Sequence, residues 1–302
     1  MKNLIIDSNN LLYRIFHINK SVNGNSLVMF FRTLRHYVEK FEPDNIFAVW
    51  DKKLIHPSTN FRKELTKTEY KANRDYSELE EIHKDDKVIA EMITSLGIKT
   101  LYPRILEGDD VIAWLAHTLP GETIIVSVDQ DFCQLVNQNV HIFSPIKKVL
   151  ITESNLEEHT KVRPDCFLRF KSICGDMSDN IQGLDGFGKV KSKKLAENWN
   201  EHSYKLTEEQ LKTVEMNMQI VNLSYGYTVY PEETESYRQQ LKDQELLQPD
   251  FTKFKEICKS NNLTEITEFF IDWTRPFKGK ETNEGMVSCV NSIVNKLKLQ
   301  YS

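Results

Sequence analysis

Three short apolar runs, each followed by an aspartate, constrain the fold of this chain most strongly. The runs occupy residues 3–6, 45–50 and 123–128, and the aspartates that follow them are Asp7, Asp51 and Asp129. Nearly continuous apolar runs are typical of strands buried on both faces, and therefore of parallel sheets. Helical patterns lie between or before these runs, at residues 26–41, 83–96 and 107–118. This order predicts an α/β fold with a mostly parallel central sheet, helices on both faces, and the three aspartates at one edge.

The rest of the chain divides by pattern into further regions. Residues 140–152 predict two short strands around a turn, and the pattern is helical from residue 153 onward. We therefore expect an α/β core over residues 1–152, a second unit over 153–200 and a helical region over 201–302. Residues 52–82 interrupt the core with a long connection that carries little apolar periodicity, which is typical of a functional segment.

Composition excludes several classes of protein. No apolar run approaches the roughly 20 residues of a membrane span, and the first residues lack a signal-peptide core. The five cysteines contain no C-x-x-C pair, so neither a zinc ribbon nor a disulfide framework is expected. A cytoplasmic protein without membrane contact is predicted. The net charge is −5, but the charge is unevenly spread, because residues 52–74 hold seven basic side chains against two acidic ones.

Nine acidic residues form the candidate catalytic cluster. They are Asp7, Asp51, Glu107, Asp109, Asp110, Asp129, Asp131, Asp176 and Asp179. Three follow the predicted strands, and the others lie in short acidic motifs, where a spacing of three places two acids on one helix face. Crowded carboxylates repel and raise each other's pKa unless cations compensate them. Oxygen ligands without His or Cys favour Mg²⁺ or Mn²⁺, and this number of carboxylates predicts two ions that act on a phosphodiester.

Taken singly, each acidic motif also suits a structural role. Asp7 could cap a helix, and the acids at 107–110 could complement a helix dipole. The acids at 129–131 and 176–179 resemble ordinary turns. The conjunction of all four groups at the ends of successive elements favours a shared site.

A basic, aromatic segment at residues 61–76 is the second candidate feature. Cations interleaved with aromatic rings suit a strand of nucleic acid, because cations meet phosphates and rings stack on bases. Lys71 and Arg74 are three residues apart and could stabilise charge that develops on a phosphate, beside the aromatic Tyr70. The alternative is a solvated helix with ordinary charges. The basic candidates for nucleic-acid contact here also include Arg62, Lys63 and Lys67.

A glycine-containing turn precedes a lysine-rich helix at residues 183–194. Backbone amides of such a turn at a helix N-terminus can receive a phosphate, and the lysines add attraction. The spacing is not that of a P-loop, so nucleoside triphosphate binding is not expected. The candidate contacts are Gly183, Gly186, Gly188, Lys189, Lys191, Lys193 and Lys194.

With these motifs assembled, residues 1–200 resemble the 5′ nuclease (flap endonuclease) family. The motifs that carry the likeness are IIDSNNLLYR (5–14), VWD (49–51), FRKE and YKANR (61–74), EGDDVIA (107–113), SVDQDFCQL (127–135) and GDMSDNIQGLDGFG (175–188). The family includes bacteriophage RNase H and 5′-exonucleases and the 5′-nuclease domain of bacterial DNA polymerase I. The chain is most similar to the stand-alone phage members, whose use is removal of RNA primers from lagging-strand fragments.

The resemblance implies a 5′-3′ exonuclease and flap endonuclease that uses two Mg²⁺ ions, which Mn²⁺ can replace. It implies a helical arch at 52–82, a helix–three-turn–helix module within 153–200 that binds duplex DNA and K⁺, and a monomer in an infected bacterial cell. Its substrates would be DNA and RNA–DNA duplexes with 5′ flaps or ends, and a single-strand DNA-binding protein would be a partner. The nine acids match the metal-binding positions of the family, and Lys71, Arg74, Asp129 and Asp131 match the catalytic ones.

Three other functions fit part of the pattern. A PIN-type ribonuclease shares the sheet and the acids but is usually shorter and lacks the arch. A Mg²⁺ phosphotransferase with an aspartate nucleophile would not need residues 61–76. A junction-binding protein without strong catalysis would be expected to have lost some of the nine acids.

Overall fold

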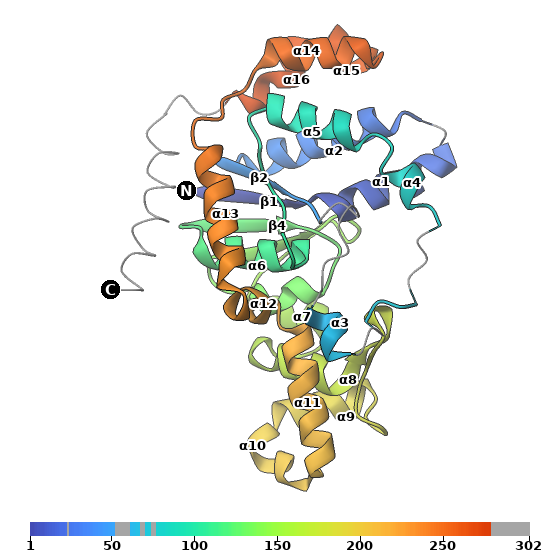
Figure 1. Cartoon of the computed structure of the whole chain (residues 1–302), viewed down its shortest axis with the longest axis vertical. Helices are drawn as coiled ribbons and strands as arrows, with labels where there is room; N and C mark the ends of the chain where they lie inside the picture. The colour runs from blue at the N-terminus through green and yellow to red at the C-terminus, as the bar shows by residue number, and fades with distance from the viewer. Residues whose placement is uncertain (23, 52–60, 67–69, 74–76, 279–302) are drawn as a thin grey trace.

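The computed structural model describes residues 1–22, 24–51, 61–66, 70–73 and 77–278, and its centre is a six-stranded sheet (Figure 1). The strands are β1 (Lys2–Asp7), β2 (Asn45–Val49), β3 (Lys99–Leu101), β4 (Glu122–Val126), β5 (Val140–Ser144) and β6 (Val149–Ile151). Their order is β3-β2-β1-β4-β5-β6, and every neighbouring pair is parallel except β5 and β6. The predicted mostly parallel α/β sheet is thereby confirmed. β3 was not predicted.

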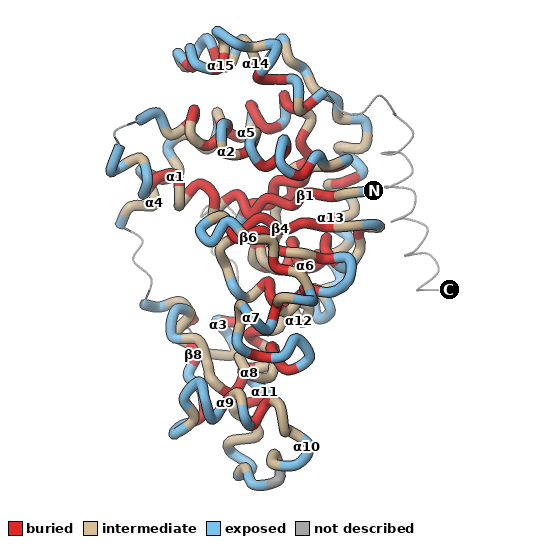
Figure 2. Tube along the Cα trace, turned by 180° about the vertical axis from the view of Figure 1, so that it is seen from behind, coloured by how far each residue is buried: buried red, intermediate tan, exposed pale blue. Residues whose placement is uncertain are grey.

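Helices cover both faces of the sheet, as expected. One face carries α1 (Ser8–Val22), α2 (Ser26–Phe41) and α5 (Asp86–Ser95), and the other carries α6 (Gly108–Thr118) with later helices. Alternate residues of one strand serve the two cores: Leu4 and Ile6 of β1 lie in the α2-side core, and Ile5 lies in the α6-side core. Burial on both faces explains why the strand sequences are apolar without alternation. Figure 2 shows this continuous buried centre.

Strand register brings the ends of the central strands to one edge. Asp7 is paired with Val49 of β2, and Ile6 is paired with Val126 of β4. Asp51 and Asp129 therefore follow their strands at the same end of the sheet as Asp7. This is the carboxyl edge, at which open α/β sheets bind ligands.

Residues 153–200 form a mainly helical unit at one end of the long axis (Figure 1). Its elements are α7 (Leu156–Thr160), η2 (Pro164–Cys166), α8 (Phe167–Cys174), β7 (Gly175–Asp176), η3 (Met177–Asp179), β8 (Ile181–Gln182), α9 (Lys189–Glu197) and α10 (Trp199–His202). The segment between α8 and α9 is a compact turn built from the short β7–β8 pair. The order helix, turn, helix is that expected from the sequence.

The helices after residue 200 return along the whole molecule. They are η4 (Ser203–Lys205), α11 (Glu208–Val221), α12 (Leu223–Val229), α13 (Pro231–Asp243), α14 (Phe251–Ser260), α15 (Thr264–Glu268), α16 (Phe270–Thr274) and η5 (Arg275–Phe277). α11 packs on α8, α12 on α6, α13 beside β3, and α14 on α5. The helices after residue 200 therefore contact both the α/β core and the unit at residues 153–200. Among the described residues, no helix combines the length and apolarity needed to cross a membrane.

The predicted arch at 52–82 lies partly outside the described residues. Within it the structure describes α3 (Phe61–Leu65), a turn at residues 70–73, and α4 (Leu79–Ile82) with the residues next to it. Elsewhere in the chain, the short helix η1 (Asp131–Leu135) follows β4. α3 packs against α11, and α4 packs against α1 at a distant part of the molecule (Figure 1). The two described helices of this connection therefore contact different parts of the fold, α3 the helix that follows the α8–α9 unit and α4 the first helix of the core.

Candidate active site

Four carboxylates lie at the carboxyl edge of the sheet, close enough for their charges to interact: Asp7, Asp51, Asp109 and Asp129. Ser127 Oγ donates to Asp7 Oδ2 at 2.7 Å, and the Asn10 amide donates to Asp7 Oδ1 at 3.1 Å. Asp51 Oδ1 accepts from the Gly108 amide at 2.6 Å, which joins the end of β2 to the start of α6. Backbone and hydroxyl donors thus fix the carboxylates at the ends of three elements.

Burial and mutual repulsion govern the protonation of this group. Burial raises the pKa of Asp7 to about 7, and the charges of Asp51 and Asp129 act in the same direction. Burial also raises the pKa of Asp109 well above its usual range, and the charges of Asp129, Asp7 and Asp51 add to the effect. Neighbouring carboxylate charges thus act together with burial to raise the pKa of Asp7 and of Asp109, while the charge of Lys71 acts to lower the pKa of Asp109.

Glu107 lies beside this group and is held by cations and a phenol. Lys71 Nζ lies 2.8 Å from Glu107 Oε1, and Tyr70 Oη donates to Glu107 Oε2 at 2.9 Å and to Asp179 Oδ2 at 3.3 Å. Burial acts to raise the pKa of Glu107, but the charges of Lys71 and Arg62 outweigh it and hold that pKa at about 2. Burial likewise opposes the charge of Lys71, but Glu107 raises the lysine pKa above its usual range. Lys71 is therefore an ammonium ion at the edge of the acidic cluster.

Lys171, on α8, stands between two other predicted ligands. Its Nζ lies 2.7 Å from Asp131 Oδ1 and also contacts Asp176 Oδ2. Burial raises the pKa of Asp131 to about 6, with the charge of Asp129 adding to the effect and Lys171 opposing it. For Asp176, burial acts to raise the pKa, but the bonds from Lys171 and Ser178 outweigh it and lower that pKa. One internal cation thus bridges the η1 turn and the β7 turn.

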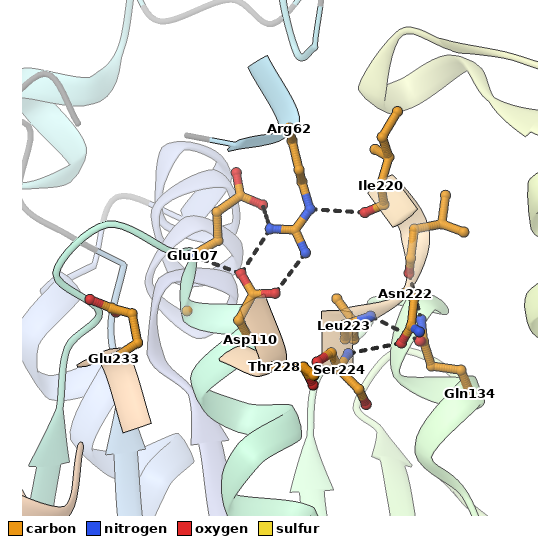
Figure 3. Close-up of polar contacts among 12 residues, drawn as sticks. Arg62, Glu107, Asp110, Gln134, Ile220, Asn222, Leu223, Ser224, Thr228 and Glu233 are labelled. Carbon is orange, nitrogen blue, oxygen red and sulfur yellow. Dashed lines mark hydrogen bonds and ion pairs between the residues drawn. The ribbon is translucent and has the colours of Figure 1, made fainter. Parts of the chain in front are cut away.

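Arg62 and Asp110 form a buried ion pair (Figure 3). Arg62 Nη2 lies 2.7 Å from Asp110 Oδ1 and Nη1 lies 2.8 Å from Oδ2, so the contact is bidentate. The side chains are 2% and 0% exposed. Arg62 Nε also donates to the Ile220 carbonyl at 2.9 Å, and a Cβ at Gly226 would press on Asp110 Oδ1 at 3.0 Å. The pair joins α3, α6 and α11 in the interior.

These contacts give some predicted site residues a different environment from the one their motifs suggested. Arg62 was predicted to contact nucleic acid, yet its guanidinium faces Asp110 inside the protein. Tyr70 was predicted to stack on a base, yet it is 4% exposed, with Lys71 Nζ 4.8 Å from its ring centroid. Asp110 was predicted to bind metal, yet both of its oxygens bond to Arg62. Tertiary packing accounts for all three differences.

The donor set fits divalent cations, although within the described residues no three His, Cys, Asp or Glu side chains stand in the geometry of a metal site. Among those residues, no basic side chain forms an ion pair with Asp7, Asp109 or Asp129. Carboxylates are the hard oxygen donors that Mg²⁺ and Mn²⁺ prefer, and neighbouring acids help to raise the pKa of Asp7 and of Asp109. The observation that supports the fit is this mutual repulsion at the strand ends.

The remaining nucleic-acid candidates lie on the α3 and α9 surfaces or outside the described residues. Lys67 and Arg74 fall outside them. Lys63, Lys189, Lys191 and Lys194 are exposed, while Lys193 is half-buried and lies 3.6 Å from Glu197. Gly186 and Gly188 are exposed and have open space around them, and Gly186 adopts a φ of 75°. Gly183 differs, since a Cβ there would collide with the Cys174 carbonyl, so it serves close packing of the turn.

Several polar residues of the site were missed by sequence reasoning. Asn9 Oδ1 accepts from the Asp51 amide at 2.8 Å, and Ser127 Oγ accepts from the Asp129 amide at 3.1 Å. Asn10 and Ser127 directly orient Asp7. A signal was available for Asn9, Asn10 and Ser127, because polar residues two or three positions from a strand-end aspartate are placed at the same edge. No local signal identified Lys171, since its partner Asp131 is 40 residues away and on another element.

Comparison with known proteins places the chain in a family. The N-terminal resolvase-like domain of 5′-3′ exonucleases matches residues 2–161. A 5′-3′ exonuclease of Mycoplasmopsis pulmonis is 32% identical over 204 residues, which are 66% of this chain and 67% of that protein. The thermostable DNA polymerase I of Thermus aquaticus is 30% identical over 205 residues, which are 65% of this chain and 24% of that protein.

A solved structure shares the fold. The D15 flap endonuclease of bacteriophage T5, in a complex with DNA and metal ions, matches with a TM-score of 0.65 at 20% identity, over 81% of this chain and 98% of that chain. The fold and the sequence matches together define a phosphodiester hydrolase. The chain belongs to the 5′-3′ exonuclease family, as the resemblance of its motifs predicted.

Proposed function

We propose that this enzyme is a structure-specific 5′-3′ nuclease that hydrolyses phosphodiesters of flapped DNA and of RNA–DNA duplexes, including RNA primers on lagging-strand fragments. The observation that carries the proposal is the group of mutually repelling carboxylates at the strand ends, next to a protonated lysine. Such a site calls for divalent cations and leaves a positive side chain available for a phosphate. The T5 flap endonuclease with the same fold was crystallised with DNA and metal ions.

In this proposal, Asp7, Asp51, Asp109, Asp129 and Asp131 hold two Mg²⁺ ions, with Glu107, Asp176 and Asp179 nearby. When bound, such a pair of ions activates water and stabilises the departing oxygen. Protonation of the carboxylates would affect the binding of these ions. The Asp7 carboxyl has a pKa of about 7 without cations, so loading near neutral pH displaces a proton from it.

Lys71 and Lys171 would act differently toward the substrate and the ions. Lys71 projects from the turn at residues 70–73 to the acidic edge, where its ammonium would stabilise charge on the scissile phosphate. Lys171 neutralises Asp131 and Asp176 and would have to leave that position for both to bind a cation. Arg74 remains a predicted phosphate contact.

Duplex DNA would lie on the α8–α9 unit. α9 presents exposed lysines after a glycine turn whose backbone is open to a phosphate. The unit adjoins the acidic edge through Lys171 on α8, so a duplex bound there would reach the cluster with its 5′ end. K⁺ in the turn, a single-strand DNA-binding partner and a monomeric state stay predictions of the sequence.

A side-by-side digestion tests this function. The purified chain is incubated with labelled 5′-flap, nicked and RNA-primed duplexes, with Mg²⁺ or with EDTA, and Asp129→Asn serves as the matched control. We expect Mg²⁺-dependent release of short 5′ products that EDTA and the substitution abolish. Cleavage of single-stranded RNA alone would favour a PIN-type ribonuclease. Tight flap binding without cleavage would favour a junction-binding protein.

A further inference from the structure

Helix α13 holds the backbone that leads into the acidic helix α6. The Gln244 side-chain amide accepts from the Thr100 N–H and donates to the Thr100 carbonyl, both at 2.8 Å. The Gln240 side-chain amide makes the same two contacts with the backbone of Tyr102, both at 2.9 Å. β3 is the edge strand of the sheet, so these side chains replace the missing neighbour of that strand. The same helix then reaches the next segment with Glu233.

Glu233 is a buried carboxylate that accepts from two backbone amides just before Glu107 and from one tyrosine of its own helix. Oε2 accepts from the Arg104 amide at 2.9 Å, Oε1 accepts from the Ile105 amide at 3.2 Å, and Tyr237 Oη donates to Oε2 at 2.9 Å. The residue is 0% exposed. Among the described residues no basic side chain forms an ion pair with it, so these donors compensate its charge.

The position of this carboxylate is what gives it a functional meaning. Arg104 and Ile105 precede Glu107 by three and two residues, and Glu107 begins the turn from which Asp109 reaches the other carboxylates. Figure 3 shows Glu233 with Glu107 and Asp110 around the start of α6. Two adjacent backbone amides bound by one rigid, buried carboxylate leave the segment little freedom to rotate. Small displacements of catalytic groups are costly, because catalysis depends on their geometry.

We propose that Glu233 is a positioning residue of the nuclease, which fixes the segment 104–107 so that Glu107 and Asp109 face the carboxylate edge. It does not contact the substrate. This inference rests on the proposed function for its kinetic and Mn²⁺-binding readouts, while its hydrogen-exchange readout needs neither substrate nor metal. The alternative is that Glu233 contributes only to stability, like Gln240 and Gln244.

Glu233→Gln tests the proposal in the full-length chain. The amide side chain offers one acceptor oxygen in place of two, so one of the two backbone amides faces an NH₂ group. We expect hydrogen exchange at Arg104 or Ile105 to accelerate at least about tenfold, because an unpaired amide is less protected. We expect kcat on a 5′-flap duplex to fall at least about tenfold and Mn²⁺ affinity to weaken, with the Kd for flap DNA in Ca²⁺ changed less than about twofold.

Gln244→Leu is the matched control. It removes two hydrogen bonds that the C-cap residue of α13 makes to the same edge, but at Thr100, seven residues before Glu107. We expect a similar fall in Tm, with kcat and Mn²⁺ affinity within about twofold of wild type. Equal losses of kcat in both variants, or normal kcat in Glu233→Gln despite faster exchange, would overturn the positioning role.

A second variant and a wild-type control separate failure of this proposal from misfolding and from failure of the proposed function. If Glu233→Gln does not fold, Glu233→Asp replaces it, because its carboxylate keeps both acceptors but is one methylene further from the amides. For Glu233→Asp we also expect faster hydrogen exchange at Arg104 or Ile105, weaker Mn²⁺ affinity and a lower kcat. Unchanged values of all three would refute the proposal. If the wild-type chain cleaves no flap, the proposed function fails, while hydrogen exchange still tests whether Glu233 fixes the segment 104–107.

Discussion

Replacing Arg62 by methionine tests the buried ion pair that joins α3 to α6. Both partners are almost completely out of solvent, and the two N–H···O contacts measure 2.7 and 2.8 Å. Arg62→Met leaves the Asp110 carboxylate buried with the Glu107 amide as a donor at 3.0 Å. Removing one partner of a buried pair costs about 3–5 kcal/mol, because the other charge stays desolvated.

The magnitude is large enough to measure by thermal unfolding. About 3–5 kcal/mol corresponds to a fall in Tm of roughly 5–8 °C for a chain of 302 residues. The double variant Arg62→Met with Asp110→Asn removes both charges and keeps an acceptor for the Glu107 amide. Its stability should return to within about 2 kcal/mol of wild type, since replacing both partners avoids the unpaired charge.

The assay is a double-mutant cycle from differential scanning calorimetry at pH 7.5 with EDTA. A coupling energy of at least about 4 kcal/mol between the two positions is expected, because each single variant costs about 3–5 kcal/mol and the double variant at most about 2 kcal/mol. Additive losses, or a single Arg62→Met variant within about 0.5 kcal/mol of wild type, would refute the ion-pair interpretation. Measuring the Kd of the double variant for flap DNA then tests whether Arg62 contacts nucleic acid directly. We expect no such contact.

Three further predictions concern the acidic edge. Asp129→Asn should abolish cleavage while fluorescence anisotropy in Ca²⁺ shows flap binding within about twofold of wild type, and a near-normal rate would exclude Asp129 as a ligand. Lys71→Ala should slow single-turnover cleavage by about 10²–10³-fold, with exposed Lys253→Ala as the control, and a change confined to Kd would make Lys71 a binding contact only. Asp7 and Asp131 have folded-state pKa values raised to about 7 and 6, so the metal-free chain should lose stability as pH rises from about 4 to 7. Mg²⁺ should therefore raise Tm more at pH 8 than at pH 5.5, and an equal shift at both would contradict the assignment.

Much of the fold follows from local pattern. The helix expected at 26–41 is α2 with the same bounds, and β1, β2 and β4 overlap the apolar runs with ends that differ by one or two residues. Their burial on both faces makes the signal strong, because each strand must be apolar throughout. β3 was missed because it has only three residues and includes a lysine, Lys99. Its outer edge is completed by Gln240 and Gln244, some 140 residues later, which no local pattern reveals.

Part of the candidate site was likewise predictable from local sequence patterns, and part of it depends on tertiary packing. The convergence of Asp7, Asp51 and Asp129 was predictable, because parallel strands share one carboxyl edge. Which acidic group or phosphate each basic side chain would contact was not predictable from the sequence. Arg62 was grouped with solvent-facing bases because its charge, and not its burial, is visible in the sequence. Whether a cation faces a phosphate or an internal carboxylate depends on tertiary packing, as the contacts of Arg62 with Asp110 and Ile220 show.

Counting bound Mn²⁺ tests the central claim most directly. Electron paramagnetic resonance of the full chain with a flap duplex would report how many ions bind and whether they are coupled. Two coupled Mn²⁺ ions per chain are expected, about 3.5–4 Å apart, with both the count and the coupling reduced in Asp129→Asn. Binding that is weak, uncoupled and unchanged by the substitution would show that the strand-end carboxylates do not form the metal site.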